Sequence, residues 1–135
     1  MPTVSDYVIV TDQKITLTKG HEHKFNFRVP DNVNTGQQAV AIWQFQAEGP
    51  PPDHTEGPPN NLAWNLTLNG LQPPLVQHAH VLNRFNAFQK VLPGSVLQPG
   101  PNEAIVKVTS GTGQIKFSDF VIYIQVDIEP PPVNG

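Results

Sequence analysis

The chain has 135 residues and a net charge of −3. Its eight Lys and Arg residues are scattered singly and form no basic stripe that could bind a phosphate backbone, so nucleic acid is not an expected partner. The absence of cysteine excludes disulfides, iron–sulfur clusters and thiolate zinc sites. Fifteen prolines and ten glycines interrupt every helical pattern, while a hydrophobic fraction of 38% suffices for a core, which predicts an all-β protein.

The length fits one domain, residues 1–128, followed by an extended Pro-rich tail at 129–135. The N-terminal residues lack the basic and apolar regions of a secretion signal, and no run approaches the roughly 20 apolar residues that span a bilayer. We therefore expect a soluble protein with no membrane partner, and we favour the cytoplasm.

The first half of the chain predicts four strands. Residues 7–10 and 14–18 are short β-prone runs separated by three residues, which favours a hairpin. Residues 21–29 alternate strictly and end at Pro30, as a half-buried strand does. Residues 39–47 place Ala, Trp and Phe side chains on one side of a further strand. The next segment, residues 48–61, holds five prolines and predicts an extended surface loop.

The middle of the chain predicts shorter strands joined by tight turns. Residues 62–68 form a strand that ends in Asn69-Gly70, the dipeptide best suited to a type I′ turn. Extended structure resumes at 75–82, and residues 83–88 fit either a loop or a strand. Residues 90–97 predict a strand followed by a short turn at Pro93-Gly94.

The last third contains two strand patterns, residues 104–109 and 114–128. The Ser-Gly-Thr-Gly turn between them predicts a β-hairpin, because its glycines adopt positive φ without steric cost. In the second strand the even-numbered apolar residues from Phe120 onward share a core face, and Tyr123 lies on the opposite, partly wet face. Eight or nine strands without an intervening helix predict an antiparallel β-sandwich, with a jelly roll as the favoured topology.

Four stretches carry a resemblance: WNLTLNG at 64–70, residues 84–97, the LQPGPNEAIVKV segment from Leu97, and GQIKFSDFVIY at 113–123. Together they are similar to the jelly roll of galactose-binding-like domains, the sugar-binding domains appended to β-glycosidases. In that superfamily a strand ending in Asn-Gly precedes a loop, and a Pro-Gly-x-Asn segment precedes the last strands. The resemblance covers residues 62–128 and implies a jelly-roll fold and sugar binding, without identifying the sugar.

Two His-x-His motifs, His21/His23 and His78/His80, form the most unusual local pattern in a chain with five histidines. Residues two apart on a strand project from one face, so four imidazoles could converge on a divalent metal such as zinc, nickel or copper. Each pair could instead lie at a strand end, hydrogen-bonded or solvated, and never meet the other.

Candidate ligand-binding residues are Asn83, Arg84 and Asn86, because a guanidinium fork and amides bind hydroxyls or carboxylates. A surface salt bridge is the alternative for Arg84. Trp43 and Trp64 could stack on a sugar ring, but both share the parity of core residues in their strands, which favours the core. The isolated carboxylates and serines predict no hydrolytic pair and no activated nucleophile.

These patterns favour a non-catalytic binding module with a carbohydrate partner and no cofactor. The competing prediction is a structural, self-assembling subunit that forms a homo-oligomer and has no small-molecule ligand. A metal-dependent enzyme that uses the two His-x-His motifs is the third.

Overall fold

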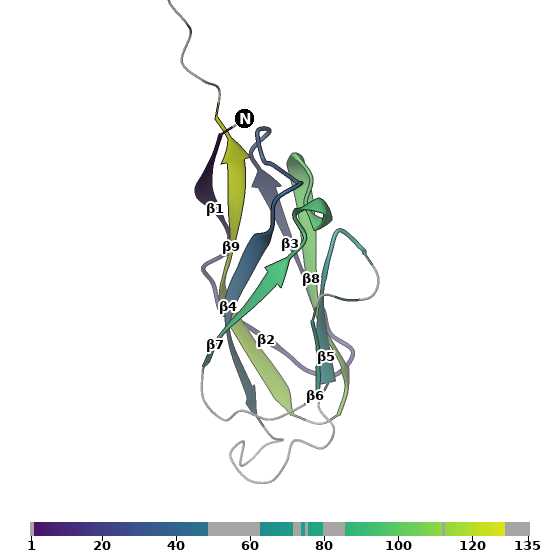
Figure 1. The fold of residues 1–135 in the computed structure, drawn as a ribbon. Coiled ribbons are helices and arrows are strands. Elements are labelled where there is room, and N and C mark those ends of the chain that lie inside the picture. Colours follow the sequence, from purple (N-terminus) through teal and green to yellow (C-terminus); the bar gives the residue numbers. More distant parts are fainter. Residues whose placement is uncertain are drawn as a thin grey trace, which may run out of the picture.

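The computed structural model describes residues 2–48, 63–71, 74, 76–79, 86–111 and 113–128, which build two layers of β-sheet (Figure 1). A short 3-10 helix, η1 (Gly94–Val96), is the only helical element among them. The strands are β1 (Thr3–Thr11), β2 (Ile15–Leu17), β3 (Glu22–Val29), β4 (Ala39–Glu48), β5 (Ala63–Leu68), β6 (Val76–Ala79), β7 (Asn86–Leu92), β8 (Gly100–Ser110) and β9 (Gln114–Asp127).

One sheet has the order β1-β9-β4-β7, with β2 pairing with β9 beyond the end of β1, and the other has the order β3-β8-β5-β6. All strand pairs are antiparallel. From β2 onward, successive strands alternate between the sheets, except for the β5–β6 hairpin. This alternation is the jelly-roll order of two Greek keys, so the predicted all-β jelly-roll sandwich is confirmed.

The core lies between the layers and is built from the inward positions of alternating strands. Trp43 on β4 and Trp64 on β5 come from opposite sheets, and each is only 2% exposed. Their rings meet edge to face, with centroids 6.4 Å apart. Both tryptophans are therefore core residues, as their parity predicted, and neither is a surface platform for a sugar.

Two predicted hairpins are wrong. β8 pairs with β3 and β5, whereas β9 pairs with β1, β2 and β4, so the turn at residues 110–113 joins the two sheets. Gly111 and Gly113 do adopt positive φ there, at 94° and 107°. β1 and β2 lie end to end along β9, on its residues 120–127 and 115–117, and do not pair with each other. In each case two amphipathic strands bury their apolar faces without pairing to each other.

β9 changes its inward parity partway along its length. Ile115 and Phe117 point into the core, and after Asp119 the inward positions are Phe120 and the alternate residues that follow. The register with β4 shifts by one residue at this place, and Asp119 has a φ of 51°. This β-bulge keeps both halves of a 14-residue strand buried on one side.

Other predicted elements agree with the structure where it describes them. Asn69 and Gly70 have φ values of 53° and 67°, as a type I′ turn requires. The segment 83–88, which fitted a loop or a strand, belongs to β7 from Asn86 onward. The loop after residue 48 and the tail at 129–135 lie outside the described residues. No helix in the described part of the chain is long and apolar enough to cross a membrane.

Candidate functional site

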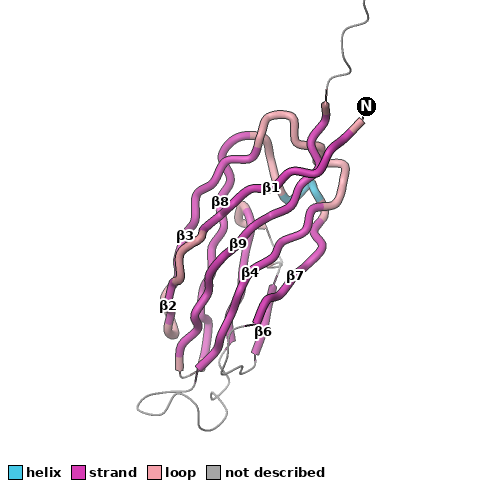
Figure 2. The backbone as a smooth tube through the Cα atoms, turned by 90° about the vertical axis from the view of Figure 1, so that its left-hand side faces the viewer, coloured by secondary structure: helices cyan, strands magenta, loops and turns pink. Residues whose placement is uncertain are grey.

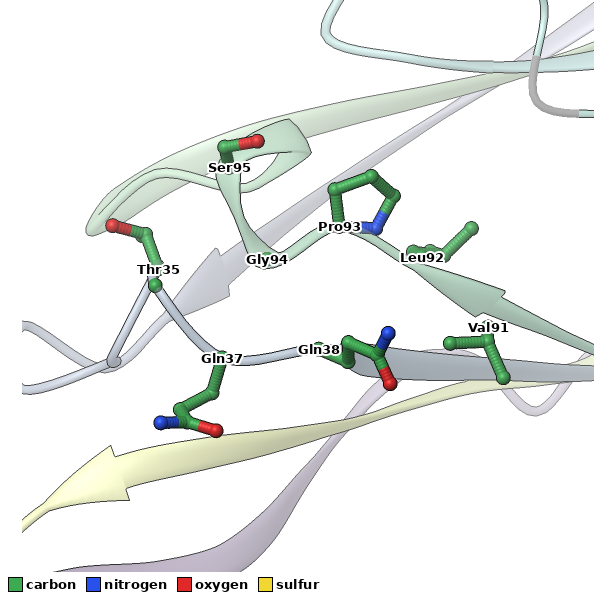
Figure 3. Close-up of a pocket in the computed structure, with 9 residues that line it drawn as sticks. Thr35, Gln37, Gln38, Val91, Leu92, Pro93, Gly94 and Ser95 are labelled. Atoms are coloured by element: carbon green, nitrogen blue, oxygen red, sulfur yellow. The ribbon is translucent and has the colours of Figure 1, made fainter.

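A pocket of about 340 Å³ lies where the loop between β3 and β4 meets the turn between β7 and η1. Figure 3 shows the two segments side by side, with Thr35 and Ser95 at one end and Gln38 and Val91 at the other. Its lining residues are Thr35, Gly36, Gln37, Gln38, Val91, Leu92, Pro93, Gly94 and Ser95. The volume falls at the lower end of the roughly 300–1,000 Å³ typical of small-ligand pockets.

Two asparagines hold the β3–β4 loop against the end of β9. The Asn34 amide donates to the Asp127 carboxylate (3.0 Å), and the Asn32 amide donates to the Asp127 carbonyl (2.8 Å). The Asn34 side-chain oxygen accepts from the Gly36 N–H at 2.9 Å, which is an Asx turn. These hydrogen bonds hold one side of the pocket rim against β9.

Gly94 lets the second wall approach the first. A Cβ atom on Gly94 would lie 2.0 Å from the Gln37 carbonyl oxygen and 2.9 Å from that of Thr35. Both contacts are to backbone, which cannot move away like a flexible side chain. The residue is buried, so a glycine is required for the two segments to pack as they do.

The polar side chains of the pocket are uncharged. They are the hydroxyls of Thr35 and Ser95 and the amides of Gln37 and Gln38, next to the apolar surfaces of Val91 and Pro93. None of these four polar side chains hydrogen-bonds to another residue in the described part of the chain. Amides and hydroxyls each offer a donor and an acceptor, so the pocket presents unused hydrogen-bonding capacity to a neutral polar ligand.

A second hollow, of about 450 Å³, lies near the β5–β6 turn, and several of its polar side chains are already hydrogen-bonded. Its Asn69 amide donates to the Val96 carbonyl and to the Asn102 side-chain oxygen, and the Asn69 side-chain oxygen accepts from the Glu103 N–H. Asn102 is itself bonded to both ends of the Gln98–Gly100 turn. These amides are committed to holding β8 against the turn, so they form a structural network.

A third hollow, of about 380 Å³, lies on the outer face of the four-stranded sheet. Glu22 and Lys107 line it and are direct partners in the β3–β8 register. Its opposite charges suit a neutral hydroxyl-rich ligand less well than the uncharged pocket does, because a charge must lose its hydration when the ligand binds.

His21 and His23 lie at the opposite edge of the four-stranded sheet from His78. His21 and His23 flank the start of β3, and His78 lies on β6, with β8 and β5 between them. Three strand spacings separate the edges, about 14 Å. Buried Trp64, the register partner of His78, and buried Val108 occupy the row between the edges.

The rings of the first motif already have local neighbours. His21 Nδ1 lies 2.8 Å from the Thr18 hydroxyl, and the His23 ring packs on Phe25 with centroids 4.5 Å apart. No group of three or more potential metal ligands occurs in the described ranges. His80 lies outside them, so the four-histidine metal site stays a prediction.

Most of the predicted polar ligand site lies outside the described residues. Asn83 and Arg84 lie outside the described residues, and Asn86 is placed only as the first residue of β7, paired with Phe45. The loop pocket is not among the sites predicted from the sequence. The available signal was two turn sequences, Asn-Thr-Gly at 34–36 and Pro-Gly at 93–94, flanked by uncharged polar residues.

No protein-family model matches this sequence, and no curated protein matches it. Many solved structures are similar in fold, among them the three that follow. Dimeric latent PorU from Porphyromonas gingivalis has a TM-score of 0.65 at 7% identity, over 93% of this chain and 13% of that one. A β-porphyranase of glycoside hydrolase family 86 from the human gut bacterium Bacteroides plebeius has a TM-score of 0.60 at 11% identity, over 94% of this chain and 21% of that one.

The third is a family 35 carbohydrate-binding module from Clostridium thermocellum, with a TM-score of 0.50 at 13% identity, over 87% of this chain and 97% of that one. This chain therefore spans about a fifth or less of the first two proteins and nearly all of the third. At such identities the likeness shows the fold alone. It agrees with the jelly-roll β-sandwich that the sequence predicted.

Proposed function

We propose that this protein is a non-catalytic carbohydrate-binding module whose ligand occupies the pocket between the β3–β4 loop and the β7–η1 turn. The observation that carries the proposal is a set of four hydroxyl and amide side chains beside an apolar wall, none of which hydrogen-bonds to another residue among those described. A sugar presents hydroxyl groups and C–H faces together, and this lining matches both.

The lining also supports binding rather than catalysis. It contains no carboxylate, imidazole or amine, so no side chain of the pocket can act as a general acid or base near neutral pH. The fold likeness to a carbohydrate-binding module of almost the same length supports the same function. Because the lining is uncharged, we expect a neutral sugar to bind in preference to a sugar acid.

The test is calorimetric titration with neutral galactan- and glucan-derived oligosaccharides and with an oligogalacturonate as the charged comparison. Gln38→Ala and Ser95→Ala should each weaken binding of the neutral ligand about two- to tenfold, the usual worth of one net hydrogen bond. Gln44→Ala is the matched control, because Gln44 is an exposed amide on the same sheet but outside the pocket.

Binding that is unchanged in both pocket variants would place the ligand elsewhere. A lack of binding to every neutral oligosaccharide at millimolar concentration would contradict the proposed function itself.

A further inference from the structure

The loop pocket shares residues with the outer face of the five-stranded sheet, which Figure 2 shows with β1, β9, β4 and β7 side by side. Val91 lines the pocket and is 55% exposed, and its register partner on β4 is Val40. Gln38 lines the same end of the pocket and lies two residues before Val40, so alternation places both on this face (Figure 3). A ligand longer than the pocket can therefore continue onto the sheet.

An apolar row leads from the pocket across the sheet. Val40 on β4 is the register partner of Tyr123 on β9, and Tyr123 is the register partner of Tyr7 on β1. The two tyrosine side chains are 46% and 57% exposed and contact each other, with ring centroids 6.2 Å apart. An exposed tyrosine presents an apolar ring with a polar hydroxyl at its tip, which suits the C–H face and the hydroxyl groups of a sugar.

A polar row runs beside the apolar one. Gln125 lies two residues after Tyr123 and Ser5 two residues before Tyr7, so both point outward like the tyrosines, next to Gln38. The Gln125 amide donates to the Ser5 hydroxyl at 2.9 Å, and these two side chains make no other hydrogen bond within the described part of the chain. The amide oxygen of Gln125 and the hydroxyl proton of Ser5 can therefore bind sugar hydroxyls.

We propose that the ligand of the loop pocket is an oligosaccharide chain that continues over Tyr123 towards Tyr7. This extension of the site rests on the proposed function, because it begins at the same pocket. Neighbouring strands are about 4.8 Å apart, close to the length of one sugar ring, so Tyr123 lies about two units from Val91 and Tyr7 about three. The site holds about three or four sugar units, the first of them in the pocket. Tyr123 is then the residue that determines the preference for chain length.

Calorimetric titration with galactan- and glucan-derived oligosaccharides of increasing length, from the monosaccharide upward, tests this extension. Affinity should rise up to about four units and then stay constant, because longer chains pass beyond the last strand of the sheet. Tyr123→Ala should weaken binding of the four-unit ligand about three- to tenfold, the usual worth of one aromatic contact, and should change monosaccharide binding less than about twofold. Tyr123→Phe keeps the ring and should keep the wild-type affinity at most lengths.

Tyr7→Ala is the second variant, and it should weaken only the ligands long enough to reach β1. Leu71→Ala is the matched control, since Leu71 is 45% exposed but lies in the β5–β6 turn on the other sheet, and its affinities should stay at the wild-type values. Thermal melts report whether each variant is folded. Because both tyrosines are exposed, at least one of their variants should melt at the wild-type temperature.

Equal affinity for one unit and for four, in a protein whose binding Gln38→Ala weakens, would overturn the extension and leave the loop pocket as a site for a single sugar. An affinity that rises with length but is unchanged in both tyrosine-to-alanine variants would also overturn it, because the chain would then leave the pocket in another direction. A lack of binding at every length would contradict the proposed function itself, and the extension with it.

Discussion

At the scale of single residues, burial follows the parity of a side chain on its strand. Ile122 on β9 is fully buried, whereas its neighbour Tyr123 is 46% exposed. The loop pocket obeys a different rule, because its shape depends on a position with no side chain. Gly94 packs so tightly against the carbonyl oxygens of Thr35 and Gln37 that the contact leaves no room for a methyl group.

Gly94→Ala should therefore damage both stability and binding. The added Cβ would meet backbone at 2.0 Å, so the two walls must separate, and overpacking of this kind costs about 1–3 kcal/mol of unfolding free energy. Oligosaccharide affinity should fall with it. Urea denaturation and calorimetric titration measure the two effects.

Gly36→Ala provides the control within the same pocket. Its Cβ would lie 3.2 Å from the side-chain oxygen of Asn34, a contact to a side chain that requires a shift of only a few tenths of an ångström. This variant should lose less than about 1 kcal/mol. Equal losses in the two glycine variants would show that the close approach at Gly94 does not determine the pocket.

At the scale of elements, the bulge in β9 lets one strand serve as the centre of its sheet. β1 and β2 pair with one side of β9 on either side of the bulge, while β4 pairs along the other. Without the extra residue, Phe117 and Phe120 could not both point into the core, since their separation of three is odd. Asp119 accommodates the extra residue in the left-handed region.

Substitutions at Asp119 should separate backbone conformation from side-chain chemistry. Asp119→Val places a β-branched residue at a φ of 51° and should cost about 1–2 kcal/mol. Asp119→Gly removes the steric penalty and loses only the 3.1 Å bond from the Ser118 hydroxyl, so it should remain within about 1 kcal/mol of wild type. Urea midpoints at constant m-value measure both; a Val variant as stable as the Gly variant would contradict the left-handed bulge.

At the scale of the whole molecule, the fold joins the two ends of the described chain. β1 pairs with β9 from Thr3 opposite Asp127 to Thr11 opposite Phe120, and the N–H of Ile128 donates to the Pro2 carbonyl. The first and last strands are thus neighbours in one sheet (Figure 1). Most pairings of the sandwich join residues far apart in sequence, and such topologies fold slowly because loops must close before contacts form.

We expect refolding in milliseconds to seconds at 25 °C, after a brief unfolding pulse that leaves prolines in their native isomers. Stopped-flow tryptophan fluorescence reports it directly, because Trp43 and Trp64 belong to opposite sheets and touch only when the layers close. A microsecond phase that carries the full fluorescence change would contradict this expectation.

The sequence by itself determined the strands and their buried faces. In each strand segment apolar and polar residues alternate with a period of two, and glycine, proline and asparagine mark the ends. The buried face from Phe25 to Val29 and the Asn69-Gly70 turn could therefore be predicted without the tertiary structure. The resemblance added the jelly roll, which the strand order confirms.

Only the tertiary structure decided which strands pair and where side chains from distant segments meet. A short turn between two amphipathic strands can form a hairpin or can cross from one sheet to the other, because both arrangements bury the same faces. The chain between β8 and β9 crosses between the sheets. The distance of His21 and His23 from His78 and the pocket between residues 35–38 and 91–95 depend on strand order and register. Local propensity cannot supply these, since they are set by the free energy of closing one core over the whole chain.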